Sequence, residues 1–213
     1  MAEPRKRAYT SQLRAEQARR TRKQIVDAAA ALFAERGYGA TTIDAVAEAA
    51  GVSRKTVFTS VGGKVELIKL AYDFAIAGDD APEPMVQREA IRALQAEPDP
   101  RKVLTAYAAL VTEIDGRITP VYVALAGAAQ VDPDAAALFE ELQRQRLDAM
   151  RMPAAKLRDD LRPGLSVERA ADILWLHNDP SLYDKLVRQR GWTPAQFRDW
   201  LAEALCDQLV GTP

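Results

Sequence analysis

The sequence contains few of the residues from which catalytic and metal-binding sites are built. It has one histidine and one cysteine, too few for a zinc site made of Cys and His ligands. The patterns GxGxxG and GxSxG do not occur, and the GGKV of residues 62–65 lacks the Ser or Thr of a phosphate-binding loop. The acidic pairs lie in polar stretches, where little would raise a carboxyl pKa; they are Asp79-Asp80, Glu140-Glu141 and Asp159-Asp160. We therefore expect no enzyme activity, no metal and no cofactor.

Long apolar segments are also absent. The longest apolar run, residues 121–129, is far shorter than the ~20 residues that span a membrane, and no secretory signal follows the charged N-terminus. The lone Cys206 has no partner for an internal disulfide, and its apolar neighbours predict a buried, inert thiol. These absences predict a cytoplasmic protein with no membrane partner.

Charge is distributed unevenly along the chain. The formal net charge is −1, but residues 1–70 hold 13 Lys and Arg against 7 Asp and Glu, whereas residues 71–213 hold 16 against 23. A basic first third favours contact with a polyanion. The acidic remainder does not, so we expect it to have a function other than binding that polyanion. The alternative explanation of the basic charge is an ordinary solvated face. The motif inside the basic third favours the first explanation.

That motif lies between residues 41 and 64 and predicts two short helices joined by a tight turn. Thr41 is expected to N-cap the first helix, with Asp44 favouring the positive end of the helix dipole. Gly51 ends this helix, because glycine adopts the left-handed conformation at little cost, and Ser53 is suited to cap the next helix. The buried stripe of the first helix has the spacing i, i+3, i+4, i+7; it consists of Ile43, Val46, Ala47 and Ala50.

The second helix of the motif has a small apolar side and a basic, hydroxyl-rich side. Val57 and Val61 can face inward, which leaves the remaining polar side chains pointing out: Arg54, Lys55, Thr56 and Thr59. A helix with such an outer face, set behind a glycine turn, is typical of a helix-turn-helix that enters the major groove of DNA. There Arg or Lys is best suited to guanine O6 and N7, while Thr42, Ser53 and Lys64 are expected to hold phosphates.

At these residues the sequence resembles a known family. Residues 23–67 are similar to the DNA-binding domain of the TetR/AcrR (tetracycline-repressor-like) family of bacterial transcriptional regulators, through IVDAAAALFAERGY, TTIDAVAEAAGVSRKTVF and the following Lys64. The sequence departs from the family pattern at Phe58, where the family usually has Tyr, at Val61, where it usually has an aromatic residue, and at Gly62-Gly63. Taken with the motif, the resemblance implies that double-stranded DNA is contacted by Thr42, Ser53, Arg54, Lys55, Thr56, Phe58, Thr59 and Lys64.

We expect an all-α fold with three parts. Residues 1–20 form a basic, flexible arm, residues 21–66 a three-helix DNA-binding domain, and residues 67–213 a helical bundle. Taken alone the arm should be mostly irregular, although residues 11–22 could extend the first helix; it either contacts DNA or is a solubilising tail. The first full helix should span 21–36, and another 64–76.

The rear helices are marked by a repeated signal, an N-cap residue followed by Pro at the first helical position. It occurs at Asp99-Pro100, Asp132-Pro133, Asp179-Pro180 and Thr193-Pro194, the last completed by Gln196 as a capping box. A shorter helix is expected over residues 85–96, one starting near Thr119-Pro120, and one capped by Ser166. No strand pattern competes with them.

The last two long segments, residues 167–190 and 194–210, are rich in apolar residues. These residues can pack in the core, against a second chain, or both, and the resemblance implies a homodimer through the last two helices of each subunit. Two helix-turn-helix units about 34 Å apart match successive major grooves. The predicted dimer residues are Leu182, Leu186, Phe197, Trp200, Leu201 and Leu205.

The resemblance also implies a pocket for a small-molecule effector among the middle helices. The apolar candidates are Tyr107, Val111, Ile114, Val121, Tyr122, Leu125, Met150 and Trp175, and the polar ones are Gln130, Arg146, His177 and Asn178. Core packing is the alternative for each apolar residue, and for His177 the alternative is a hydrogen-bonded role near a helix end.

We interpret the sequence as a homodimeric, ligand-responsive transcriptional regulator, in the first instance a repressor that binds a palindromic operator. A weakly specific architectural DNA-binding protein without an effector is the second hypothesis. A protein-interaction module with a vestigial helix-turn-helix is the third.

Overall fold

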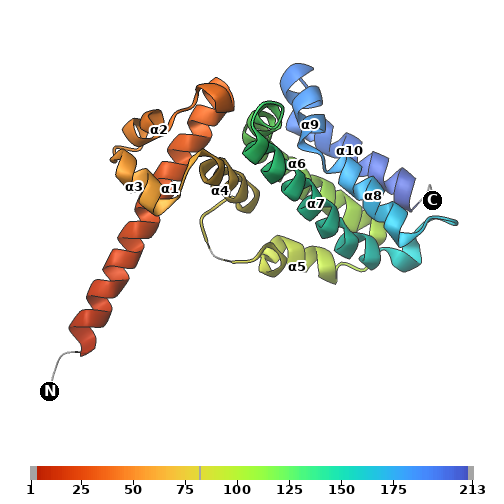
Figure 1. Cartoon of the computed structure of the whole chain (residues 1–213). Coiled ribbons are helices and arrows are strands. Elements are labelled where there is room, and N and C mark those ends of the chain that lie inside the picture. Colours follow the sequence, from red (N-terminus) through yellow and green to blue (C-terminus); the bar gives the residue numbers. More distant parts are fainter. Residues whose placement is uncertain (1–3, 82, 211–213) are drawn as a thin grey trace.

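The computed structural model describes residues 4–81 and 83–210, with side chains from Leu13 onward, and within these ranges it contains helices and no strand (Figure 1). The expected all-α fold is therefore confirmed. The α-helices in chain order are α1 (Pro4–Ala40), α2 (Ile43–Ala49), α3 (Arg54–Ser60), α4 (Lys64–Ala77), α5 (Glu89–Ala96), α6 (Pro100–Ala128), α7 (Pro133–Lys156), α8 (Val167–His177), α9 (Pro180–Tyr183) and α10 (Pro194–Leu209). Short turns of other helix types stand between them: η1 (Met85–Gln87), η2 (Arg158–Asp160) and η3 (Asp184–Gln189).

Helix α1 is much longer than predicted. It begins at Pro4 rather than at Thr21 and projects away from the rest of the molecule in Figure 1, so the region expected to be an irregular arm is helical. Residues 11–20 are rich in Ala, Arg, Gln, Leu and Glu, which all favour helix. Arg19 also anchors this part, because its Nε and Nη2 donate to the two carboxylate oxygens of Asp80 over 2.7 and 2.9 Å. The side chains of residues 4–12 lie outside the described part of the chain.

The prediction of a helix start at Thr119-Pro120 is wrong. Pro120 lies inside α6, which runs without a break from Pro100 to Ala128. A proline in a helix interior removes one backbone hydrogen bond and costs about 3 kcal/mol relative to Ala. Ile118 and Val121, on either side of Pro120, are both buried in the same hydrophobic cluster. Packing on both sides therefore outweighs the local preference of the proline.

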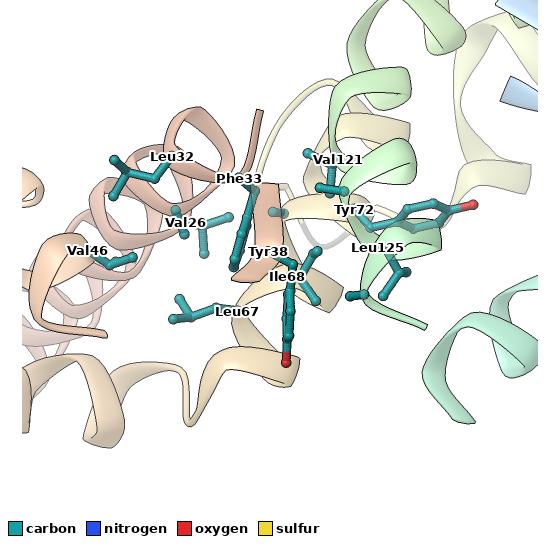
Figure 2. Packing of buried hydrophobic residues seen from close by; sticks show 14 of the residues in the cluster. Val26, Leu32, Phe33, Tyr38, Val46, Leu67, Ile68, Tyr72, Val121 and Leu125 are labelled. Carbon is teal, nitrogen blue, oxygen red and sulfur yellow. The ribbon is translucent and has the colours of Figure 1, made fainter. Parts of the chain in front are cut away.

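Two hydrophobic clusters hold the helices together. The front cluster joins α1–α4 to the second half of α6 and the start of α7, and the rear cluster joins the first half of α6 and the end of α7 to α8–α10. Figure 2 shows the front cluster, with Phe33 and Tyr38 from α1 and Ile68 from α4 next to Val121 and Leu125 of α6. Helix α6 takes part in both clusters, so it connects the front of the molecule with the rear.

Candidate nucleic-acid interface and cavity

The end of α1 and the start of α2 are held by two neighbouring threonines with different tasks. Thr42, not Thr41, is the N-cap of α2, and its Oγ1 accepts a hydrogen bond from the backbone N–H of Ala45 over 3.1 Å. Thr41 is buried, and its hydroxyl lies 2.8 Å from the carbonyl oxygen of Gly37 and 3.1 Å from that of Leu32. The cap prediction was thus one residue early, because two capping-type residues stand side by side. Thr41 instead fixes the turn out of α1.

The turn between α2 and α3 follows the sequence prediction. Gly51 has a φ of 65°, the left-handed conformation that glycine adopts readily. Ser53 caps α3 by accepting a hydrogen bond from the N–H of Thr56 over 3.1 Å. Val57 is fully buried against the front cluster, which fixes the rotation of this short helix about its axis. The opposite face of α3 is consequently directed outward.

The outward face of α3 carries the predicted DNA-contacting side chains. Arg54, Lys55, Phe58 and Thr59 are exposed, and Thr56 is half-buried. The Thr59 hydroxyl donates to the backbone carbonyl of Lys55 over 3.0 Å, which orients its methyl group and leaves its oxygen able to accept. The face thus offers two cations, a hydroxyl and an aromatic ring. Phe58 is 46% exposed, and its ring lies beside the Arg54 guanidinium.

Arg54 is held in place by its neighbours. Its Nη1 lies 2.8 Å from Asp44 Oδ2, and its guanidinium carbon lies 5.6 Å from the centroid of the Phe58 ring. Both charged groups are well exposed, so the ion pair contributes little to stability. Asp44 therefore positions Arg54 across the turn without binding it strongly.

Lys64 lies at the junction of α1, α4 and the start of α7. Its Nζ is 4.1 Å from the centroid of the Tyr38 ring and 3.4 Å from the carbonyl oxygen of Gly39. Burial lowers the pKa of Lys64, an effect that Asp132 partly opposes. The Tyr38 hydroxyl donates to Asp132 Oδ2 over 3.0 Å, and burial, together with this hydrogen bond, raises the pKa of Tyr38. Lys64 is thus partly occupied by protein contacts, unlike the exposed Lys55.

A cavity of about 450 Å³ lies behind these helices, enclosed by α4, η1, α5, α6, α7 and α8. Six of the residues predicted for a pocket line it: Tyr107, Val111, Ile114, Arg146, Met150 and Asn178. Most of the remaining wall is apolar, with Leu104 and Ile118 from α6, Leu142 from α7 and Leu174 from α8. The cavity is therefore a mainly hydrophobic chamber with few polar groups.

Six further residues predicted for the pocket do not line the cavity. Val121 and Leu125 pack in the front cluster, because they lie beyond the point where α6 leaves the chamber. Gln130 follows the end of α6 and is also outside. The other three, Tyr122, Trp175 and His177, contact neighbouring residues instead: Tyr122 hydrogen-bonds to Asp179, Trp175 lies beside Arg146 and His177 contacts Ile173 and Gln208.

His177 has the hydrogen-bonded role that was the alternative to a ligand contact. Its Nδ1 lies 2.9 Å from the carbonyl oxygen of Ile173, one turn earlier in α8, and its Nε2 lies 3.2 Å from Gln208 Nε2 of α10. His177 therefore ties α8 to α10 near the helix end.

Arg146, which lines the cavity, is the centre of a group of polar side chains. Its Nη2 pairs with Asp179 Oδ2 over 2.8 Å, and its Nη1 donates to the carbonyl oxygen of Asn178 over 2.7 Å. Its guanidinium carbon is 5.4 Å from the centroid of the Trp175 ring. The Tyr122 hydroxyl donates to Asp179 over 3.2 Å. Asp179 also caps α9, so this group is part of the structural frame.

Sequence reasoning missed Asp115, which lines the cavity and is only 1% exposed. Burial is the main cause that raises the pKa of its carboxyl to about 8, while Arg146 acts in the opposite direction. A signal was available, because Asp115 stands four residues after Val111 and three before Ile118 on the apolar stripe of α6. An acidic residue in that stripe departs from the pattern of a buried helix face.

The predicted dimer residues fall into two groups. Phe197, Leu201 and Leu205 are fully buried in the rear cluster of their own chain, so their assignment to an open interface is corrected to core packing. Leu182, Leu186 and Trp200 are half-buried and remain partly accessible. Leu176 of α8, which the sequence analysis did not single out, is 58% exposed. An apolar surface at α8 and α10 therefore exists, but it is smaller than predicted.

Two further properties concern the described residues only. In residues 4–81 and 83–210, no helix is long and apolar enough to cross a membrane. The same part of the chain brings together no group of three or more His, Cys, Asp or Glu side chains that could hold a metal ion.

Comparison with known proteins gives a local match in sequence. The family profile described as bacterial regulatory proteins, tetR family, matches residues 25–71, which contain the C-terminal part of α1 together with α2, α3 and part of α4. The HTH-type transcriptional regulator TtgR of Pseudomonas putida is 40% identical over 58 residues, which is 27% of this chain and 28% of that protein. The aligned segment thus spans little more than a quarter of this relative.

Solved structures resemble nearly the whole chain. NalD, described as the secondary repressor of the MexAB-OprM multidrug efflux pump in Pseudomonas aeruginosa, matches with a TM-score of 0.66 and 21% identity, over 91% of this chain and 98% of that one. The fatty acid degradation regulator FadR from Bacillus halodurans matches with a TM-score of 0.67 and 14% identity, over 86% and 93%. At such identities the likeness concerns the fold.

Proposed function

The chain belongs to the tetR family of bacterial regulatory proteins, and we propose that it is a homodimeric transcriptional repressor released from its DNA operator by a small molecule. The observation that carries the proposal is the outward face of α3. A helix of seven residues, capped by Ser53 and fixed in rotation by the buried Val57, presents Arg54, Lys55 and Thr59 to solvent. This arrangement suits a major groove, where side chains of a recognition helix meet base edges.

The residues of the motif divide into two roles. Arg54, Lys55, Thr56 and Thr59 meet base edges, and of these Arg54 or Lys55 is suited to a bidentate contact with guanine. Thr42, Ser53 and Lys64 stand at helix N-termini, where a hydroxyl, an ammonium and the backbone N–H groups favour a phosphate. Phe58 has no hydroxyl to donate to a phosphate, so it supplies an apolar contact with a sugar or a thymine methyl group.

Dimerisation supplies the affinity that one short recognition helix lacks. The half-buried Leu182, Leu186 and Trp200, together with the exposed Leu176, give α8, the α9–η3 segment and α10 an apolar surface that a second copy can cover. Two copies related by a two-fold axis bind a palindromic site. The N-terminal part of α1, with Arg14 and Arg20, adds positive charge near the duplex.

Effector binding in the cavity shifts the balance between two arrangements of the recognition helices. The effector must bind the arrangement that does not fit the operator more tightly. Arg117 of α6 donates to the carbonyl oxygens of Ala75 and Ile76 at the end of α4 over 2.9 and 3.2 Å. Arg88, just before α5, donates to that of Ala77 over 2.9 Å. These contacts join the cavity wall to the helix that follows the DNA-binding motif.

Selection of genomic DNA fragments by the purified full chain tests the proposal. We expect the bound fragments to share an inverted repeat whose half-sites lie on one face of the duplex, and to bind as one dimer per site at about 150 mM salt. Binding should be retained in the presence of excess random DNA. A steep salt dependence without preference for any sequence would instead support a weakly specific architectural protein, and no binding at low salt would exclude a DNA-binding role.

A further inference from the structure

We propose that the cavity binds an apolar molecule with one basic nitrogen, whose ammonium group pairs with the carboxylate of Asp115. The inference rests on the proposed function, because it names the chemical class of the effector that the cavity takes. It depends on an observation that is independent of the DNA-binding motif, namely a buried acidic side chain with an unsatisfied oxygen in the wall of an apolar chamber.

The carboxyl group of Asp115 is one of two groups in the cavity wall with a buried atom that has no hydrogen-bond partner among the described residues; the other is the guanidinium of Arg146. Asp115 is 1% exposed, and its Oδ2 has no hydrogen-bond partner among the residues that the structure describes. A buried polar atom without a partner costs free energy, and such atoms are rare in folded proteins. Thr119, one turn further along α6, also has a buried hydroxyl without a partner in the described chain. Thr119 is not among the residues that line the cavity, so it is Asp115 that gains from a ligand bringing a polar group to the wall.

The charges around Asp115 favour a cation over an anion. Arg146, the basic residue of this part of the wall, is already neutralised by Asp179 over 2.8 Å and also bound to the carbonyl oxygen of Asn178. The Nε of Arg146 is also buried without a partner in the described chain, but a ligand carboxylate at that nitrogen would be repelled by Asp179, which already balances the guanidinium charge and caps α9 through the N–H of Ser181. The other basic lining residue, Lys156, lies ten residues further along α7, about 15 Å away by helical rise. Among the described residues of the wall, no spare positive charge therefore stands beside Asp115.

The titratable groups that act on Asp115 come from four helices. They are Tyr72 from α4, Tyr107 from α6 itself, Arg146 from α7, Asp179 at the start of α9 and Tyr183 from α9. Burial is the main cause that raises the pKa of each of the three tyrosines, so they are neutral and cannot balance a buried carboxylate. An ammonium group brought in by the ligand can balance it, because a buried charge is tolerated when paired.

The rest of the cavity determines the remainder of the ligand. Most of its wall is formed by aliphatic and methionine side chains, among them Leu104, Ile118, Leu142 and Met150, with a minority of polar residues. Such a wall favours a hydrocarbon or aromatic body through burial of apolar surface. Methionine adapts to ligands of different shape, so the chemical class is better defined than any single compound.

Binding of the ammonium releases a proton. With a pKa of about 8, the carboxyl group of empty Asp115 is mainly protonated at neutral pH. When the ligand enters as R-NH₃⁺, the Asp115 proton leaves to solvent, and the product is a carboxylate paired with the unchanged ammonium. Affinity for an amine should therefore rise up to about tenfold per pH unit between pH 6 and 8, whereas affinity for a neutral analogue should stay constant.

A matched set of three probes tests the proposal: decylamine, 1-decanol and decanoate, each below its micelle concentration. Binding to the full-length protein is measured by titration calorimetry at pH 7 in phosphate and in Tris. We expect decylamine to bind at least tenfold more tightly than the other two, with release of nearly one proton. Tighter binding of decanoate, or binding of decylamine without proton release, would overturn the proposal.

Two substitutions locate the effect. Asp115→Asn keeps the shape of the neutral acid, so the chain should fold, and it should remove both the preference for decylamine and the proton release while 1-decanol binds as before. Asp148→Asn changes an exposed acid at the rim of the same cavity and should leave both unchanged. An unaltered amine preference in the Asp115→Asn protein would contradict the inference.

The outcomes also separate this inference from the proposed function. If 1-decanol or decanoate binds and decylamine has no advantage, the cavity is still a ligand site and the inference alone is wrong. If none of the three probes binds the protein, the effector cavity and the inference are both wrong. Operator binding, measured without any probe, is independent of either result.

Discussion

The helix-turn-helix and the cavity differ in how they treat polar groups. In α2 and α3 the helix starts are capped by Thr42 and Ser53, and the outward side chains are either exposed or paired with a neighbour. All the buried side-chain nitrogen and oxygen atoms without a partner in the described residues lie further along the chain; they belong to Arg88, Asp115, Thr119, Arg146 and Trp175. The polar groups of the helix-turn-helix are thus satisfied without DNA, whereas two of the unpartnered groups, those of Asp115 and Arg146, line the cavity, where a ligand can satisfy them.

The difference also concerns packing. The front cluster contains fully buried side chains from α1–α4 and α6 (Figure 2), whereas a chamber of about 450 Å³ lies between α4–α8. A filled core makes the position of α3 rigid, which a base-reading helix requires. A chamber leaves its walls free to adjust, and this suits a helix arrangement that a ligand must shift.

The largest expected effect is on stability. It is seen by comparing one substitution in the front cluster with one in the cavity wall. Phe33→Ala removes a side chain that is 1% exposed in the front cluster, and it should lower the free energy of unfolding by about 3–5 kcal/mol. Ile114→Ala, in the cavity wall, should lower it by only about 1 kcal/mol, because Ile114 is half-buried and packs against the edge of the front cluster while also lining the cavity. Urea unfolding of both variants measures the difference. Equal losses would show that the cavity wall is as tightly packed as the front.

The second effect is a pH dependence that comes from Asp115. Because its pKa is raised in the folded state to about 8, from about 4 when unfolded, the folded state binds more protons between these values. Its contribution to stability is full below the unfolded-state pKa and is lost as the pH rises through the folded-state pKa, by at most about 1.4 kcal/mol per pH unit.

Urea unfolding from pH 4 to pH 9 measures this slope. We expect Asp115→Asn to remove it, so that the variant is more stable than the parent at pH 8 and no more stable at pH 4. Asp148→Asn is the control at an exposed position of the same cavity. An Asp115→Asn curve parallel to that of the parent would mean that Asp115 is ionised in the folded protein.

The third effect concerns the cap of the recognition helix. Ser53→Ala removes the hydrogen bond from Ser53 Oγ to the N–H of Thr56 and should lower stability by about 1 kcal/mol. It should also weaken DNA binding, because α3 has only seven residues and its first turn carries Arg54. Ser60→Ala, at the other end of α3, is the matched control and should change neither. If both variants behave alike, the cap does not hold α3 in place.

The smallest expected effect is on operator affinity and comes from removing the ion pair at the recognition surface. Asp44→Asn removes the partner of Arg54, which frees the guanidinium and deletes one negative charge facing the phosphates. Operator affinity should rise about two- to fivefold. Glu48→Gln removes an exposed acid from the same helix and controls for net charge. A rise of equal size in both variants would mean that the Arg54 pair plays no part in binding.

The elements that the sequence predicts correctly are those with local signals. Helix α10 begins at Pro194 with Thr193 as cap and Gln196 completing the capping box, and Gly51 and Ser53 give the turn before α3. All these signals lie within four residues of the contact that they make. They could therefore be recognised without knowledge of the rest of the fold.

Features that depend on distant contacts were not predictable in this way. Pro120 is typical of a helix start, yet burial of Ile118 and Val121 carries α6 through it. The apolar stripe of Phe197, Leu201 and Leu205 would look the same in the sequence whether it packed against a second chain or in the core. In the structure it packs in the core. The cavity depends on where α4 and α5 lie against α6, which no local pattern encodes. Asp115 was the one residue in the apolar stripe of α6 that indicated it.

The most direct test of the account is the ratio of operator affinity to random-DNA affinity for the parent and for Arg54→Ala, at one salt concentration near 150 mM. We predict that Arg54→Ala weakens operator binding by about 1–3 kcal/mol and relaxes one base position, with a much smaller loss on random DNA. Arg198→Ala, an exposed arginine of α10 paired with Asp199, should change neither affinity. An equal loss on operator and random DNA in Arg54→Ala would contradict the assignment of α3 as the helix that reads the sequence.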